Sequence, residues 1–188
     1  MLEKYKKQNK KNIQTGILIG IILLLIAVIL WLFSLKNIAY IFLVAGILII
    51  ITSILEALNL KDIESSMSEN ELEALEQELN KVIMESTNHY VVTENGIFIP
   101  NKLTLIKYED IILIYERPRF NRDTVEVYIN IITKEKERFK LPTYTTALTI
   151  GFEYYDLKEI IKKKNPKVLI GKNANHKKIL QEKYQIKL

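Results

Sequence analysis

The sequence predicts a small membrane protein made of a two-helix transmembrane hairpin, a helical connector and a cytosolic α+β domain. Two uncharged apolar runs, an acidic stretch after them and a C-terminal half rich in short β-branched segments support this fold class. The chain of 188 residues suffices for one small domain with an anchor. With no cysteine and only two histidines, the sequence excludes disulfides, thiolate metal sites and a multi-histidine metal centre.

The two apolar runs cover residues 15–33 and 38–55, and the loop 34–37 separates them. At about 1.5 Å per residue, each helix is roughly 27–29 Å long, which matches the hydrocarbon core of a bilayer. A cleaved signal peptide is the alternative, but the first run is too long and lacks a small-x-small cleavage site. Five lysines lie in the N-terminal segment 1–14 and only Lys36 in the loop, which predicts a cell-membrane protein with both termini cytoplasmic.

Small residues in the first run provide candidate helix-packing positions. Gly16 and Gly20 form a GxxxG pair, a pattern that allows helices to approach closely and can support a homo-oligomer. Neither run contains Asp, Glu, Lys, Arg or His, so we do not expect a pore or a pump.

The connector, residues 56–88, carries nine acidic side chains against two lysines, a net charge of −7. Ser68 and Glu71 match a capping box, and an apolar stripe follows at Leu72, Leu75, Leu79 and Val82. We therefore expect a helix from residue 69 to residue 86. Its stripe packs on the soluble domain or a neighbouring helix, or it forms a short dimer seam; its glutamates are expected to be a solvated face without a catalytic role.

The sequence of the cytosolic domain, residues 89–188, predicts strands followed by helices. Strands are expected at residues 90–93, 97–100, 103–106, 111–116, 124–133 and 138–141, with short connections that favour antiparallel pairing. Asn95 and Gly96 are expected to supply positive φ angles in a tight turn. A helix should run from about Phe152 to the Asn165-Pro166 stop, followed by an extended piece at 168–170 and a last helix capped by Asn173 or Asn175. The result is an antiparallel sheet or half-barrel closed by a C-terminal helix.

Several segments of this domain resemble a known family. Residues 90–97 (YVVTENGI), 108–111 (YEDI) and 165–171 (NPKVLIG), together with the long strand and the terminal helix, are similar to two-span bacterial membrane proteins with a pleckstrin-homology-like (PH-like) domain. The resemblance implies a PH-like sheet capped by a helix. It also implies a binding or scaffolding module rather than an enzyme, and it carries over no catalytic residue.

Basic residues are the strongest candidates for contacts. Residues 89–188 carry nineteen Lys or Arg against twelve Asp or Glu, and the segment from Lys158 onward has a net charge of +8. Near an anionic leaflet each lysine contributes on the order of 1 kcal/mol of attraction. The alternative is that these lysines keep the domain soluble or pair with the acidic connector. The candidate contacts for anionic lipid headgroups or a protein partner are Arg117, Arg119, Arg122, Lys162, Lys163, Lys164, Lys177 and Lys178.

The sequence contains no motif for catalysis, a cofactor, a metal ion or nucleic acid. We therefore predict a non-enzymatic integral membrane protein whose PH-like domain recruits a partner or senses anionic lipid at the inner leaflet. An oligomeric structural or assembly subunit, joined through Gly16, Gly20 and the 72–82 stripe, is the alternative. A membrane-bound enzyme built from scattered residues is the third hypothesis.

Overall fold

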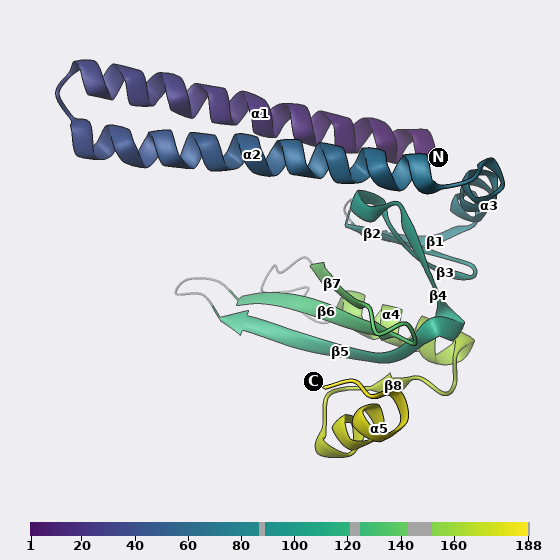
Figure 1. The fold of residues 1–188 in the computed structure, drawn as a ribbon. Helices are drawn as coiled ribbons and strands as arrows, with labels where there is room; N and C mark the ends of the chain where they lie inside the picture. Colours follow the sequence, from purple (N-terminus) through teal and green to yellow (C-terminus); the bar gives the residue numbers. More distant parts are fainter. Residues whose placement is uncertain (87–88, 121–124, 143–151, 188) are drawn as a thin grey trace. The chain divides into compact units, whose positions relative to one another are not determined.

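The structure is a computed structural model that describes residues 1–86, 89–120, 125–142 and 152–187. It divides into two compact units (Figure 1). The helical unit comprises Met1–Glu76 with Asn101–Leu103, and the sheet unit comprises Gln77–Pro100 with Thr104–Leu188. The prediction of a helix pair joined by a helical connector to a small, mainly antiparallel α+β domain is confirmed.

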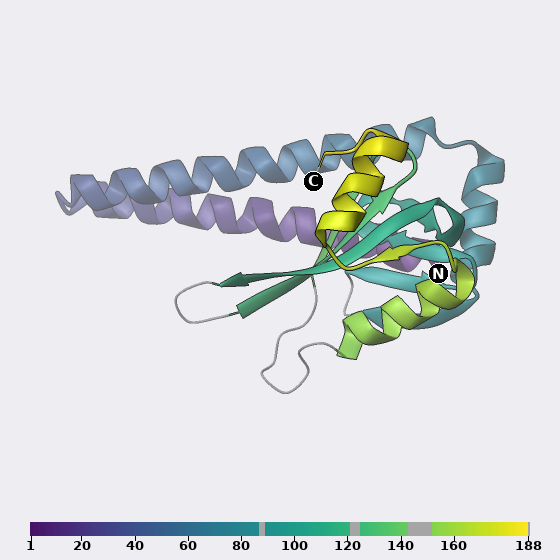
Figure 2. The ribbon, with the colours of Figure 1, turned by 90° about the horizontal axis from the view of Figure 1, so that it is seen from below.

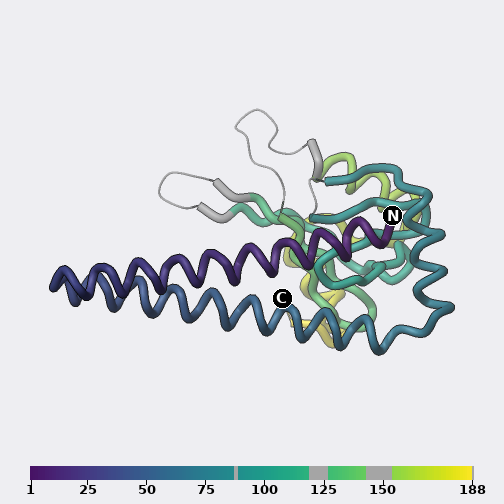
Figure 3. The backbone as a smooth tube through the Cα atoms, turned by 90° about the horizontal axis from the view of Figure 1, so that it is seen from above, coloured from purple at the N-terminus to yellow at the C-terminus, as the bar shows by residue number. Residues whose placement is uncertain are grey.

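Two long helices form the helical unit. α1 (Leu2–Leu32) and α2 (Lys36–Ser66) lie side by side, as Figure 3 shows, and each is about 46 Å long. Both are long and apolar enough to cross a membrane. The turn between them is tighter than the predicted loop 34–37, because Ser34 adopts a φ of 63° and the amide of Leu35 donates to the Leu30 carbonyl at 3.0 Å.

Small side chains form the interface between α1 and α2. The buried positions of α2 recur every seven residues, at Ala39, Gly46, Ser53 and Leu60. Gly20 and Ala27 are buried at the same spacing on α1. A seven-residue repeat keeps one stripe of each helix facing its partner, so the two helices pack along a seam of mostly small residues.

Two glycines bring the helix backbones together. A Cβ atom added at Gly46 would lie 2.9 Å from the carbonyl oxygen of Gly20, and one added at Gly20 would lie 3.0 Å from the carbonyl oxygen of Gly46. One turn away, a Cβ atom at Gly16 would overlap the hydroxyl of Ser53. Only glycine permits this approach, so Gly16 and Gly20 lie in the interface between α1 and α2 of one chain.

The connector differs from the prediction at its C-terminal end. α3 (Glu69–Leu79) begins at the predicted capping box, where the amide and hydroxyl of Ser68 both donate to Glu71 Oε2 at 2.8 Å. The predicted continuation of this helix to residue 86 is wrong. Residues Val82–Ser86 form strand β1, which pairs antiparallel with β2, because backbone hydrogen bonds to a neighbouring strand outweigh the helical spacing of Val82.

The first sheet of the sheet unit has the order β1-β2-β3-β4 and is antiparallel throughout, with β2 (Tyr90–Thr93), β3 (Gly96–Ile99) and β4 (Thr104–Lys107). The short helix η1 (Pro100–Lys102) joins β3 to β4. The expectation of positive φ at Asn95 and Gly96 is wrong, since neither residue has one. The Thr93 hydroxyl instead closes the turn through the backbone of Gly96, and a Cβ atom at Gly96 would overlap the carbonyl oxygen of Ile106.

The second sheet has the order β7-β6-β5-β8. It contains β5 (Ile111–Phe120), which follows the short helix η2 (Tyr108–Asp110), as well as β6 (Val125–Thr133), β7 (Arg138–Pro142) and β8 (Leu169–Ile170). β8 is parallel to β5, unlike every other pair in the two sheets, because α4 (Phe152–Lys164) carries the chain back before β8 begins. The last helix, α5 (Ala174–Tyr184), is capped by the Asn173 side chain, which accepts from the amide of His176 at 2.7 Å.

Each face of the second sheet packs against a different helix (Figure 2). On one face, Ile114, Ile129 and Ile131 share a core with residues of the first sheet and with Leu157 and Ile161 of α4. On the other face, Leu180 of α5 packs in a separate cluster with Ile112, Leu113, Tyr115, Ile132 and Ile186. α4 and α5 therefore cover opposite sides of this sheet.

Candidate functional site

The structure distributes the predicted basic contacts over three elements. Lys162, Lys163 and Lys164 form the exposed last turn of α4, where positive charge is favourable at a helix C-terminus. Lys177 and Lys178 are exposed on α5, and Lys178 lies 3.8 Å from Glu182. Because α4 and α5 cover opposite faces of the second sheet, the lysines belong to two groups rather than to one continuous stripe.

The arginine group lies at the end of the β5–β6 hairpin. Arg117 is exposed on β5, opposite Tyr128 of β6. Arg119 is two residues further along β5, so the two positions share a face of the strand, but the side chain of Arg119 is outside the described part. Arg122 lies outside the described residues altogether.

Glu78 forms a buried polar contact that stabilises the sheet unit. Glu78 is buried and accepts from the amide and the side-chain nitrogen of Asn95, at 2.8 Å each. Burial alone raises the pKa of Glu78, but hydrogen bonds from Asn95 and Thr93 and the charge of Lys81 outweigh it and hold the pKa below its usual range. The carboxylate therefore stays ionised and joins the end of α3 to the β2–β3 turn.

A second set of hydrogen bonds joins Asn165, the residue after α4, to the backbone of η2 and of the start of β5. The side-chain nitrogen of Asn165 donates to the carbonyls of Tyr108 and Ile111, at 2.8 Å each. The Tyr108 hydroxyl in turn donates to the Thr93 carbonyl at 2.7 Å, and burial together with the nearby charge of Glu78 raises the pKa of this hydroxyl. The Asn165 amide and the Tyr108 hydroxyl therefore donate to backbone carbonyls inside the domain, and neither residue lines a described cavity.

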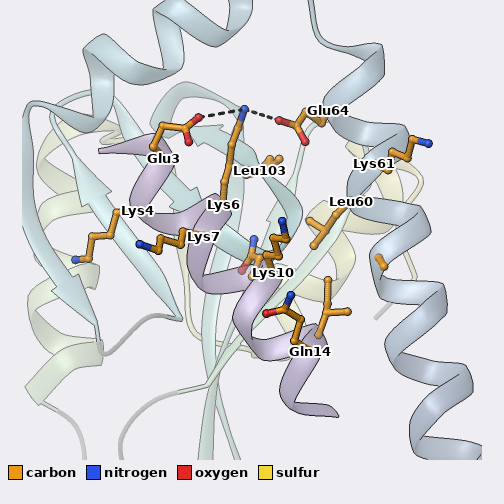
Figure 4. Close-up of a pocket in the computed structure, with 13 residues that line it drawn as sticks. Glu3, Lys4, Lys6, Lys7, Lys10, Gln14, Leu60, Lys61, Glu64 and Leu103 are labelled. Atoms are coloured by element: carbon orange, nitrogen blue, oxygen red, sulfur yellow. Dashed lines mark ion pairs between the residues drawn. The ribbon is translucent and has the colours of Figure 1, made fainter. Parts of the chain in front are cut away.

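A cavity lies in the helical unit, between the N-terminal part of α1 and the C-terminal part of α2 (Figure 4). It is an open cleft of about 800 Å³. Lys6, Lys10 and Gln14 contribute from α1 at a spacing of four residues, which places them on one helix face. Ala57 and Leu60 contribute from α2 and, with Ile13, give the cleft an apolar wall.

The charges of the cleft are unevenly paired. Its lining includes five lysines (Lys4, Lys6, Lys7, Lys10 and Lys61) but only two carboxylates, Glu3 and Glu64. The Lys6 ammonium pairs with both carboxylates: its Nζ lies 2.5 Å from Glu64 Oε1 and 3.9 Å from Glu3 Oε1. Figure 4 shows the Lys10 side chain between the two helices, and among the described residues no carboxylate pairs with it. The cleft therefore has an excess of three positive charges.

This cleft was not predicted from the sequence, because the N-terminal lysines indicated only the orientation of the hairpin. The available signal was the seven-residue repeat of α2, which continues through Ser53 to Leu60 beyond the apolar run. Extending that repeat predicts that the polar ends of both helices stay paired and that Lys10 faces α2.

Fold and cleft together define a class: a pair of long apolar helices joined to a small α+β domain, with a basic cleft at the open end of the pair. No family model, curated protein or solved structure matches the chain. Among the described residues, no group of three or more His, Asp or Glu side chains is placed to hold a metal ion.

Proposed function

We propose that this chain is a non-enzymatic integral membrane protein whose α1 and α2 span the cell membrane with both termini in the cytoplasm. Its sheet unit is a PH-like module that binds the anionic lipid of the cytoplasmic leaflet through the exposed lysines of α4 or of α5. A protein partner for the same lysines, and an assembly subunit joined between copies, are the competing functions.

The arrangement of small and large residues in the hairpin carries this proposal. In a water-soluble helix pair, large apolar residues fill the seam and polar residues face outward. Here the seam consists mostly of glycine, alanine and serine, whereas leucine, isoleucine and valine face outward. Only 11% and 17% of the most apolar windows of α1 and α2 are buried in the chain. This inverted pattern is typical of helices whose outer surface contacts lipid.

The orientation follows from the charges that flank the apolar segment. Lys4, Lys6, Lys7, Lys10 and Lys11 precede it on α1, whereas the turn between the helices is followed by Lys36 alone. Trp31 and Tyr40 meet edge to face near this turn, with ring centroids 5.3 Å apart, where an aromatic belt at the outer interface is expected. The lysine-rich ends therefore belong on the cytoplasmic side.

Residue-specific acetylation of the full chain tests the role of the lysines. The protein is reconstituted in nanodiscs of phosphatidylcholine alone or with phosphatidylglycerol, and lysine modification is measured by mass spectrometry over a salt series. The lysines of the helix that contacts the lipid, either Lys162–Lys164 or Lys177 and Lys178, should react more slowly in anionic nanodiscs at low salt, and this protection should disappear at high salt. Lys107 and Lys136, exposed elsewhere in the sheet unit, are the internal controls.

Equal modification in both lipids at every salt concentration contradicts lipid binding by these helices and favours a protein partner. Protection of only one helix assigns the contact to that helix, because α4 and α5 cover opposite faces of the second sheet.

A further inference from the structure

We infer that the cleft between α1 and α2 binds one anionic phospholipid of the leaflet from which the helix pair emerges. In this arrangement the lipid phosphate contacts Lys10, and the start of an acyl chain follows the wall formed by Ile13 and Ala57. This site is separate from the lysines of α4 and α5. It rests on the proposed membrane insertion of the hairpin.

The depth of Lys10 matches the position of a lipid phosphate. Lys10 precedes the apolar run, which begins at Thr15, by five residues. At the rise of an α-helix this places its backbone about 7 Å outside the hydrocarbon core. The headgroup region of a bilayer extends roughly 5–8 Å beyond the core on each side. Lys61, six residues beyond Leu55 on α2, reaches a similar level, about 9 Å outside.

The charge of the cleft favours an anionic ligand over a zwitterionic one. The two carboxylates of the cleft are already engaged with Lys6, which leaves Lys10 directed into the cleft without a counter-ion among the described residues. A phosphate group supplies that counter-ion and accepts charge-assisted hydrogen bonds from the ammonium and from the Gln14 amide one turn further along α1. The choline group of a zwitterionic lipid would add a positive charge beside an excess of positive charge.

The apolar wall favours a lipid over a free phosphate ion. Ile13 and Ala57 each lie two residues outside the apolar runs 15–33 and 38–55, so the wall continues directly from the apolar surface of the hairpin. Ala57 has a small side chain, which leaves room beside α1 at the depth where the glycerol esters and first methylenes of a lipid lie. A soluble phosphate gains nothing from this wall, whereas a phospholipid buries apolar surface against it.

Lipid binding to the purified full chain tests the inference. The delipidated protein in neutral detergent is titrated with phosphatidylglycerol, phosphatidylcholine or soluble glycerol phosphate, and the bound fraction is measured by native mass spectrometry. We expect phosphatidylglycerol to bind and the other two to bind at least tenfold more weakly. Lys10→Gln should weaken phosphatidylglycerol binding about tenfold, since it removes a charge-assisted contact.

Lys11→Gln is the matched control, because Lys11 is the next residue on α1, has the same charge, is exposed and does not line the cleft. Ala57→Leu fills the cleft without a change of charge and should also weaken binding. Equal loss in the Lys10 and Lys11 variants overturns the inference, since it indicates a diffuse charge effect. Glycerol phosphate binding as tight as that of the lipid overturns the lipid as occupant, as does equal binding of phosphatidylcholine.

Failure of this inference can be separated from failure of the proposed function. Alkaline carbonate extraction of cell membranes reports insertion without reference to the cleft. A Lys10→Gln variant that remains in the extracted membrane but binds phosphatidylglycerol like the wild type overturns the cleft site alone. A wild-type chain released by carbonate overturns both.

Discussion

Substitution of Gly46 by leucine should separate α1 from α2. Even a Cβ atom at this position would lie 2.9 Å from the carbonyl oxygen of Gly20 and 3.1 Å from the side chain of Leu24. Ordinary contact begins near 3.4 Å, so alanine alone requires the helices to move apart by about 0.5 Å. The three further carbons of leucine enter the same space.

The expected cost of Gly46→Leu is about 2 kcal/mol of hairpin stability. Overpacking of a close contact costs about 1–3 kcal/mol, and the gain of about 1 kcal/mol in helix propensity relative to glycine offsets part of it. Because the obstacle is backbone rather than a flexible side chain, the packing cost should lie at the upper end. Gly46→Ala has the same gain in helix propensity and a smaller steric clash. It should lower hairpin stability by between about 0 and 2 kcal/mol.

Unfolding of the purified protein in mixed micelles, followed by circular dichroism, measures this cost. Val44→Leu is the matched control, since Val44 is on α2 two residues away and its side chain is 53% exposed. If the Gly46 and Val44 variants are equally stable, α1 and α2 do not meet at these glycines and the seam described above is incorrect.

Three further predictions test the seam and the hydrogen bonds of Glu78 and Asn165. With no native cysteine in the chain, Gly16→Cys combined with Ser53→Cys should give an intrachain disulfide, because the Cβ atoms would lie 3.4 Å apart; a crosslink only between chains contradicts the seam. Glu78→Gln should lower stability by about 1–2 kcal/mol at pH 7. Folding lowers the pKa of Glu78, so the ionised carboxylate stabilises the folded wild type at neutral pH. This extra stability relative to Glu78→Gln should be lost as the pH falls from about 4.3 through the folded-state pKa. Hydrogen exchange of the β2–β3 amides at several pH values measures the loss. Asn165→Ala leaves the Tyr108 and Ile111 carbonyls without their side-chain donor and should cost about 2 kcal/mol, seen as faster exchange in α4; unchanged exchange refutes these hydrogen bonds.

The elements with a strong local signal were predictable. The apolar runs 15–33 and 38–55 predict the membrane-spanning parts of the two long helices, which extend to Leu2 and to Ser66. The capping box predicts the start of α3, and Asn165-Pro166 predicts the end of α4. Each depends on neighbours within a few residues, so sequence spacing alone identifies it. Asn173 was one of two predicted caps, and its side-chain hydrogen bond decides between them.

The features that depend on distant partners were not predictable in the same way. Val82 continues the helical stripe of α3, and only its pairing with Thr93 places it in a strand. The parallel pairing of β8 depends on where α4 returns the chain, which local sequence does not specify. The lysines from Lys158 onward were predicted to form one basic C-terminal segment. They lie in two groups instead, because α4 and α5 pack on opposite faces of the second sheet. The cleft at Lys10 required the paired continuation of both helices beyond their apolar runs.

The most direct test of the central claim, a hairpin that crosses the membrane and returns, uses the absence of native cysteine. Single variants Asn37→Cys, next to the turn, and Asn80→Cys, after α3, place one exposed thiol on each side of the proposed membrane. A membrane-impermeant maleimide should label Asn37→Cys in intact cells and Asn80→Cys only after permeabilisation. Labelling of both, of neither, or of Asn80→Cys alone in intact cells contradicts the proposed topology.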